Sequence, residues 1–320
     1  MVKIILNHNY NDDKSVKLFF DHQLSNPERL GLDLNEVYSW LDVSPPYVDF
    51  SAVHETEDGG LTARVDAQYP LGLENGPMVS SETGRHVAIL LSALLGKVRQ
   101  PSKKEYYLVT AAELTRLSGA DASSQSTALN VSAQLSVQEK RSAKGFGYTW
   151  DDDGNAIHRL DCTFSIISEG VFKRIFSKEN FERRSYSTNP YDQLPAIDNV
   201  LVSDHELTAT YGPLGDFGCL GHFDSVPASP LSVVLFAVCR ACGRFALHVD
   251  GRPNKSFSIT HAIVGTGTLP LGDKQLEITI SEPRHIEGDI YKFWCVASAE
   301  GEMACTVDMT VTITDFHAKS

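Results

Sequence analysis

Two residues of the chain combine a reactive side chain with a setting that could use it. His222 lies in GHFDSVPASP, a turn with two prolines that leads into an apolar segment of helical character. A neutral imidazole takes up protons effectively near pH 7. Glu82 lies near the start of a second such segment, VSSETGRHVAILL, and a carboxyl group buried there would favour its protonated form. Together they could perform acid–base chemistry, although a loop histidine and a first-turn helix glutamate also occur without any such role.

The segments that must position these residues follow the same order twice. A strand-like run, LTARVDAQYP, and a glycine-bearing turn precede the first apolar helix, and three runs rich in β-branched and aromatic residues follow it. Past residue 200 a strand, a turn, the second apolar helix and four strand-like runs repeat that order. A central helix followed by long strands, twice over, predicts the α+β class.

The repeat also divides the chain. Helices are expected around 14–23 and 35–41, and the SPPY at 44–47 ends the segment that contains them. A further helix is expected in the polar stretch VFKRIFSKENF. We expect four parts: an N-terminal extension over 1–44, a first domain over 45–170, a linker over 171–200 and a second domain over 201–320.

The segment GHFDSVPASPLSVVLFAVCRACG resembles the region that defines the β-hydroxyacyl-ACP dehydratases of bacterial fatty-acid synthesis. Residues 221–223 match the family's GHF-type motif, and Pro227 and Pro230 match the two prolines of its turn. The resemblance implies a hot-dog fold, in which an antiparallel sheet wraps a long central helix. It also implies that His222 is the catalytic histidine.

The acid that the second half lacks is present in the first. The family has its acid fourteen residues after the histidine, where this chain has Phe236. When QYPLGLENGPMVSSETGRH is lined up with the same pattern, Gln68 falls on the histidine position and Glu82 on the acid position, at a constant offset of 154. Family members are dimers whose site takes one residue from each subunit. The resemblance therefore implies two tandem hot-dog domains forming a pseudo-dimer, with one composite site of His222 and Glu82.

The resemblance assigns further residues to this site. The backbone N–H of Leu231 falls where the family binds the thioester carbonyl oxygen, whereas the first half has Pro77 there, which lacks an N–H. His86 replaces a glutamine that bonds the acid in the family, so it could orient Glu82 or simply pack. The motif and its turn contribute two more expected substrate contacts, Phe223 and Pro230.

The implied function is dehydration of 3-hydroxyacyl thioesters, carried on acyl carrier protein or CoA, to trans-2-enoyl thioesters in fatty-acid or polyketide biosynthesis. His222 would remove the C2 proton as the base, and Glu82 would protonate the departing C3 hydroxyl as the acid. The same fold also suits an enoyl-thioester isomerase, a thioesterase, or a non-catalytic module that binds acyl groups or docks a carrier. Chain length and carrier stay open, as does the association of two pseudo-dimers into a homodimer.

Composition limits the remaining classes of function. The formal charge of −13 argues against a nucleic-acid partner, since phosphate binding needs a basic face. The sequence contains no run of eighteen apolar residues, which a membrane-spanning helix would need. The N-terminus does not resemble a signal peptide, so we expect a cytoplasmic protein. Cys239 and Cys242 form a CxxC, but no second pair with metal spacing follows. We therefore expect these cysteines to pack in a core, and we expect neither a metal nor a cofactor.

Overall fold

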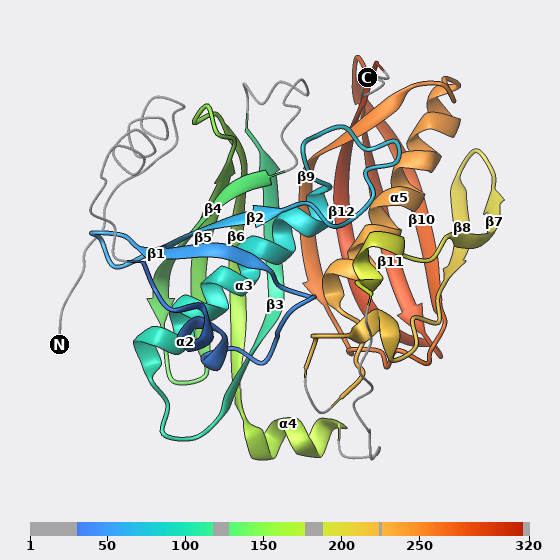
Figure 1. Cartoon of the computed structure of the whole chain (residues 1–320). Coiled ribbons are helices and arrows are strands. Elements are labelled where there is room, and N and C mark those ends of the chain that lie inside the picture. Colours follow the sequence, from blue (N-terminus) through green and yellow to red (C-terminus); the bar gives the residue numbers. More distant parts are fainter. Residues whose placement is uncertain (1–30, 118–127, 177–187, 224–225, 316–320) are drawn as a thin grey trace.

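Two long helices and one large sheet make up most of the molecule (Figure 1). The computed structural model describes residues 31–117, 128–176, 188–223 and 226–315. The long helices are α3 (Ser80–Arg99) and α5 (Leu231–Asp250), each packed against its own part of the sheet. The shorter helical elements are α2 (Leu34–Ser39), α4 (Glu169–Phe176), η1 (Pro190–Gln193) and η2 (Phe217–Cys219).

The described residues contain twelve strands that form a single antiparallel sheet in the order β1-β2-β4-β5-β6-β3-β9-β12-β11-β10-β8-β7. The strands of the first half are β1 (Phe50–Glu55), β2 (Leu61–Asp66), β3 (Glu105–Arg116), β4 (Ala128–Gln138), β5 (Ser142–Trp150) and β6 (Ala156–Ser168). Those of the second half are β7 (Ile197–Val202), β8 (Glu206–Tyr211), β9 (Ser256–Thr266), β10 (Leu276–Glu287), β11 (Ile290–Ala299) and β12 (Glu302–Thr314).

The pairing of β3 with β9 joins two equivalent halves. Outward from that pair the strands run β3, β6, β5, β4, β2, β1 on one side and β9, β12, β11, β10, β8, β7 on the other. Each strand therefore has a counterpart at the same place in the other half, and α3 corresponds to α5. This arrangement confirms the predicted α+β double hot-dog fold, with the two central helices in mutual contact.

Burial along the elements explains why these segments adopt these structures. Buried and less buried positions alternate along β6 and β12, as a sheet with one covered face requires. Both central helices end at a residue in the left-handed conformation, Gln100 after α3 and Gly251 after α5. Helix α5 has the length and mean hydropathy of a membrane-crossing segment, but 72% of its apolar window is buried against protein. Burial in the core therefore explains why this helix is so apolar.

Several elements differ from the sequence-based expectations. The helix expected around 35–41 is α2, whereas the one expected around 14–23 lies outside the described residues. The helix expected in the linker begins as α4 at Glu169, and its later part also lies outside the described residues. Strands β1, β5 and β7 were not predicted, and β7 begins at Ile197, inside the expected linker.

Candidate functional site

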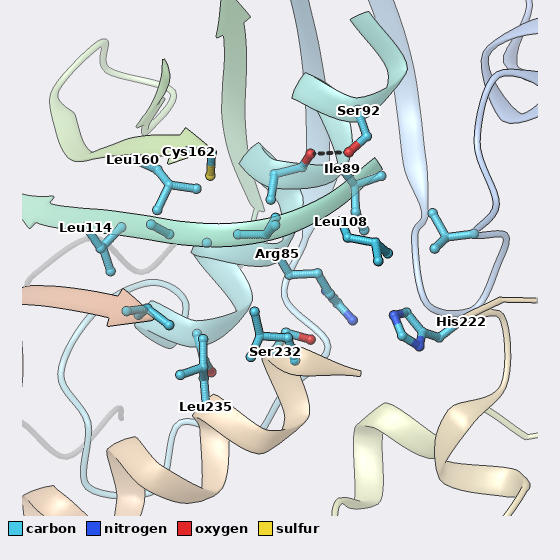
Figure 2. Close-up of a pocket in the computed structure, with 18 of the residues that line it drawn as sticks. Arg85, Ile89, Ser92, Leu108, Leu114, Leu160, Cys162, His222, Ser232 and Leu235 are labelled. Atoms are coloured by element: carbon cyan, nitrogen blue, oxygen red, sulfur yellow. Dashed lines mark hydrogen bonds between the residues drawn. The ribbon is translucent and has the colours of Figure 1, made fainter. Parts of the chain in front are cut away.

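A cavity of about 170 Å³ lies between the two central helices and the middle of the sheet. Both halves line it, and most of the lining is apolar. The sheet contributes Leu108, Val109, Ala112 and Leu114 from β3, Leu160 and Cys162 from β6, Ile259, Ala262 and Val264 from β9, and Val307 and Met309 from β12. Figure 2 shows polar side chains at one end of this space, where Arg85 of α3 and Ser232 of α5 lie near His222.

The first half holds the turn that carries His222. The backbone N–H of Phe223 donates to the Asp42 carbonyl over 3.1 Å, and the N–H of Ser44 donates to the Gly221 carbonyl over 2.8 Å. Gly221 has φ of +79°, and a Cβ atom there would lie 2.3 Å from the Ser44 carbonyl oxygen. Only glycine permits both that conformation and that approach. The glycine of the GHF motif therefore fixes the turn against a segment that sequence analysis had assigned to the N-terminal extension.

His222 itself is set up as a neutral base. Its Nδ1 lies 2.9 Å from the Ala228 carbonyl oxygen, which can only accept, so Nδ1 carries the proton and Nε2 keeps its lone pair. Burial lowers the pKa of the imidazole to about 4, although the bond to Ala228 opposes that shift. The Tyr47 ring packs edge-on against it, with ring centroids 4.9 Å apart. His222 lines the cavity and is uncharged at neutral pH.

Glu82 forms an ion pair with Arg85 but does not line the cavity. Its carboxylate is fully buried and accepts hydrogen bonds from the backbone N–H groups of Gln68 and Tyr69, over 2.7 and 3.0 Å. The Arg85 Nη2 donates a third bond to it over 2.8 Å. Both carboxylate oxygens are thus occupied by donors from the same half. Its role as an acid stays a prediction, and it would require one of these bonds to open.

The bounds of α3 and α5 show which residues of the two halves are equivalent, and the result differs from the alignment made on the sequence alone. Leu231 begins α5 151 positions after Ser80 begins α3, and the two end caps are separated by the same 151. The offset of 154 that placed Glu82 opposite Phe236 therefore does not hold along the helices. Arg85, one turn after Glu82, is the counterpart of Phe236.

Aromatic side chains enclose Arg85. Its Cζ lies 4.6 Å from the ring centre of Tyr69, 5.3 Å from that of Tyr47 and 5.6 Å from that of Tyr191. Such ring faces stabilise a desolvated cation. The hydroxyls of Tyr47 and Tyr69 in turn share hydrogen bonds with Ser232 Oγ, over 3.0 and 2.8 Å. The polar end of the cavity, formed by Tyr47, Arg85, His222 and Ser232, is therefore built from both halves.

The other predicted site residues take different positions. Leu231 is the first residue of α5 and lines the cavity, as does Phe223. Pro230 precedes α5 as its N-cap residue and lies outside the lining. His86 Nε2 lies 3.2 Å from Arg85 Nη2 and 3.6 Å from the Glu82 carboxylate, and burial lowers its pKa to about 4. His86 thus contacts Arg85 and Glu82 and does not line the cavity.

The CxxC motif lies within α5, where both cysteines are buried. Burial raises the pKa of the Cys239 and Cys242 thiols, so neither is a ready nucleophile. Among the described residues no three histidine, cysteine or acidic side chains gather as a metal site would require. Cys239 also lines the cavity, where it acts as a small apolar side chain.

Sequence reasoning missed three residues of the polar end, Tyr47, Arg85 and Ser232. Arg85 carried a signal, because it is a charged residue three positions after Glu82 at the edge of an apolar helical stripe. Such spacing places two side chains on one helix face. Tyr47 and Ser232 carried none, since a tyrosine after two prolines and a serine in a helix's first turn are common.

Comparison with known proteins places the fold. No family model matches the chain, and no curated protein matches it. Among solved structures, a candidate oleoyl thioesterase from Lactobacillus plantarum aligns with a TM-score of 0.54 at 11% identity, over 80% of this chain and 97% of that one. A TesB protein of Mycobacterium avium subspecies paratuberculosis aligns with a TM-score of 0.53 at 11% identity, over 88% and 99%. At such identity these likenesses support the double hot-dog fold, and the names they carry are not those of dehydratases.

Proposed function

We propose that the protein acts on acyl thioesters and dehydrates 3-hydroxyacyl thioesters to trans-2-enoyl thioesters, with His222 as the base. One observation carries the proposal: a buried, neutral imidazole lies at the polar end of an otherwise apolar cavity that both halves line. An imidazole with that tautomer can accept a proton from carbon through Nε2. The apolar remainder of the cavity suits an acyl chain.

The size of the cavity favours short acyl groups. An engineered apolar cavity of roughly 150 Å³ accommodates benzene, so the 170 Å³ found here is matched by about six carbon atoms. We therefore expect acyl groups of about four to six carbons to react fastest. The carrier, acyl carrier protein or CoA, would remain outside the cavity.

The reaction needs only one proton acceptor. Nε2 of His222 would remove the proton from C2, and the electron pair of that C–H bond would pass onto the thioester carbonyl as an enolate. That pair would then form the C2–C3 double bond as the C3–O bond breaks. The same proton, now on His222, would pass to the departing hydroxyl and leave with it as water. The Leu231 N–H, at the first position of α5, could bind the carbonyl oxygen. Glu82 would then balance the positive charge of Arg85 and would not donate a proton.

Thioester hydrolysis is the second candidate, favoured by the thioesterase name of one solved structure with a similar fold. His222 would then activate a water molecule in place of a C–H bond. The two reactions leave different products, since hydrolysis releases a free acid and a thiol, whereas dehydration leaves the thioester intact and removes water.

The test follows both products at once. Purified protein is incubated with 3-hydroxyacyl thioesters of four to twelve carbons on CoA and on acyl carrier protein, and mass spectrometry reports enoyl thioester and free acid separately. His222→Ala should lower the rate of enoyl formation by roughly 10²–10⁴-fold. The matched control His205→Ala, an exposed position between β7 and β8, should leave it unchanged.

Three outcomes would count against dehydration. Free acid and thiol as the main products would favour hydrolysis. Full activity in His222→Ala would remove the proposed base. Tight binding of thioesters without any product would favour the non-catalytic module.

A further inference from the structure

Arg85 has hydrogen-bonding capacity that the protein leaves unused. Its Nη2 donates to Gln68 Oε1 over 2.7 Å and to Glu82 Oε1 over 2.8 Å. Its Nε and Nη1 are buried and have no hydrogen-bond partner, although the side chain lines the cavity. A buried donor without a partner is unfavourable, and more so when it is charged. The spare donors of Arg85 therefore indicate an acceptor that enters from the cavity.

The surroundings hold this cation in place without using those donors. Glu82 balances its charge through one nitrogen only, and the rings of Tyr47, Tyr69 and Tyr191 surround the guanidinium. A guanidinium does not lose its proton in proteins, so Arg85 presents fixed positive charge to the cavity. Figure 2 shows the end of its side chain directed toward the imidazole of His222.

We propose that Arg85 binds the carbonyl oxygen of the substrate thioester and stabilises the enolate that forms when His222 removes the C2 proton. The carbonyl carbon is bonded to C2, so the residue that binds the oxygen must lie beside the base. Arg85 meets that requirement, and one of its two unpartnered nitrogens, Nε or Nη1, can donate to that oxygen as negative charge develops on it. This inference rests on the proposed function and adds a catalytic residue to it.

The first experiment measures recognition of the carbonyl without any reaction. In a His222→Ala background, calorimetry compares butyryl-pantetheine with S-butyl-pantetheine, the thioether that lacks the carbonyl. The pantetheine arm is common to CoA and acyl carrier protein. The thioester should bind at least about tenfold more tightly than the thioether, as a hydrogen bond to a charged group allows. Adding Arg85→Gln should remove most of that preference and leave only the share that the Leu231 N–H contributes. Equal binding of the two ligands before Arg85 is changed, or binding of neither, overturns the proposal.

A third ligand tests whether the group that Arg85 binds is a thioester carbonyl or a free carboxylate. Butyrate offers a carboxylate in place of a thioester carbonyl. Tighter binding of butyrate than of the thioester, lost on Arg85→Gln, would identify the ligand as a free carboxylate and overturn the thioester assignment.

The second experiment distinguishes a catalytic Arg85 from one that only neutralises Glu82. Arg85→Gln should lower enoyl formation by about 10²–10³-fold, the range for removal of an oxyanion donor. In Glu82→Gln/Arg85→Gln no unpaired charge is buried, and thermal unfolding should show a folded protein. Its activity should stay as low as that of Arg85→Gln. Recovery of wild-type activity in the double variant overturns the proposal.

Failure of this inference and failure of the proposed function give different results. Dehydration that survives Arg85→Gln would leave the function standing and remove Arg85 from it. An Arg85-dependent preference for the thioester, without any enoyl product, would keep the carbonyl site and reject the dehydratase.

Discussion

The first turns of α3 and α5 occupy equivalent places and have opposite chemistry. At the third helical position α3 has Glu82 where α5 has Val233, and at the sixth it has Arg85 where α5 has Phe236. All four side chains are buried. The scaffold therefore accepts either an ion pair or two apolar side chains at this place. A pseudo-dimer can thus specialise one copy for chemistry and the other for packing.

The loops before the two helices differ in the complementary way. Residues 67–79 connect β2 to α3, whereas the connection from β8 to α5, residues 212–230, is six residues longer. The longer loop carries His222, and the shorter one carries the backbone donors that bind Glu82. Each half thus supplies one part of the polar end, and neither contains all of it.

Glu82→Gln should have the largest effect on stability among single changes at this place. The variant leaves the Arg85 charge buried without its partner, which typically costs about 3–5 kcal/mol. Urea unfolding followed by circular dichroism measures the loss. Adding Arg85→Gln should recover most of it, because the uncompensated charge is gone. A stability loss of less than about 1 kcal/mol in the single variant, a value typical of exposed pairs, would show that this ion pair is not needed.

Gly221→Ala and Gly72→Ala compare the two loops directly. Both glycines have positive φ, +79° and +60°. The Cβ added at Gly221 meets the Ser44 carbonyl, whereas the one added at Gly72 meets the end of the flexible Arg240 side chain. We expect Gly221→Ala to cost about 2–3 kcal/mol and to reduce activity by displacing His222, and Gly72→Ala to cost about 1 kcal/mol with activity kept. Thermal unfolding and initial rates measure both, and equal losses of activity would contradict the assignment of the longer loop to the site.

Acidification should weaken the protein through its buried histidines, two of which lie beside Arg85. The pKa of His222 and that of His86 are both lowered to about 4 from 6.5, so the unfolded chain binds protons that the folded chain does not. Their contribution to stability is complete above about pH 6.5 and is lost as the pH falls toward 4, by about 1.4 kcal/mol per pH unit for each group. Urea unfolding between pH 7 and 5 measures the slope. His222→Ala should lower the slope of the unfolding free energy against pH by the contribution of one histidine. An unchanged slope would mean that His222 is protonated in the folded protein.

The sequence predicted the helices and most strands because their patterns are long and regular. It missed β5, since Gly145 and Gly147 are typical of turns. In the fold a Cβ at Gly147 would lie 2.0 Å from the Ser132 carbonyl oxygen, and one at Gly145 would lie 2.6 Å from the Leu91 side chain. Those glycines therefore permit close packing inside a strand, a reason that only the neighbouring strand and helix reveal.

For the site, counting along the chain singled out a histidine that lines the cavity, but it chose Glu82 of α3, which does not line the cavity, and passed over Arg85, which does. Glu82 and Arg85 lie one helical turn apart, and the start of α3 decides which of them corresponds to Phe236. Helix starts are the least certain part of any sequence-based assignment. The tyrosines around Arg85 come from residues 47, 69 and 191, and their meeting depends on tertiary structure alone.

The central pairing of β3 with β9 has a consequence for synthesis of the chain. Ala111 pairs with Gly265, so β3 leaves the ribosome long before its partner strand exists. At roughly 5–20 residues per second, this edge stays open for on the order of 10–30 s. During that time it could pair with the same strand of a chain on a neighbouring ribosome. Because the second half is tethered to the first, its local concentration favours the correct partner once it emerges. Fusion of the two domains thus also protects a nascent strand from its own copies.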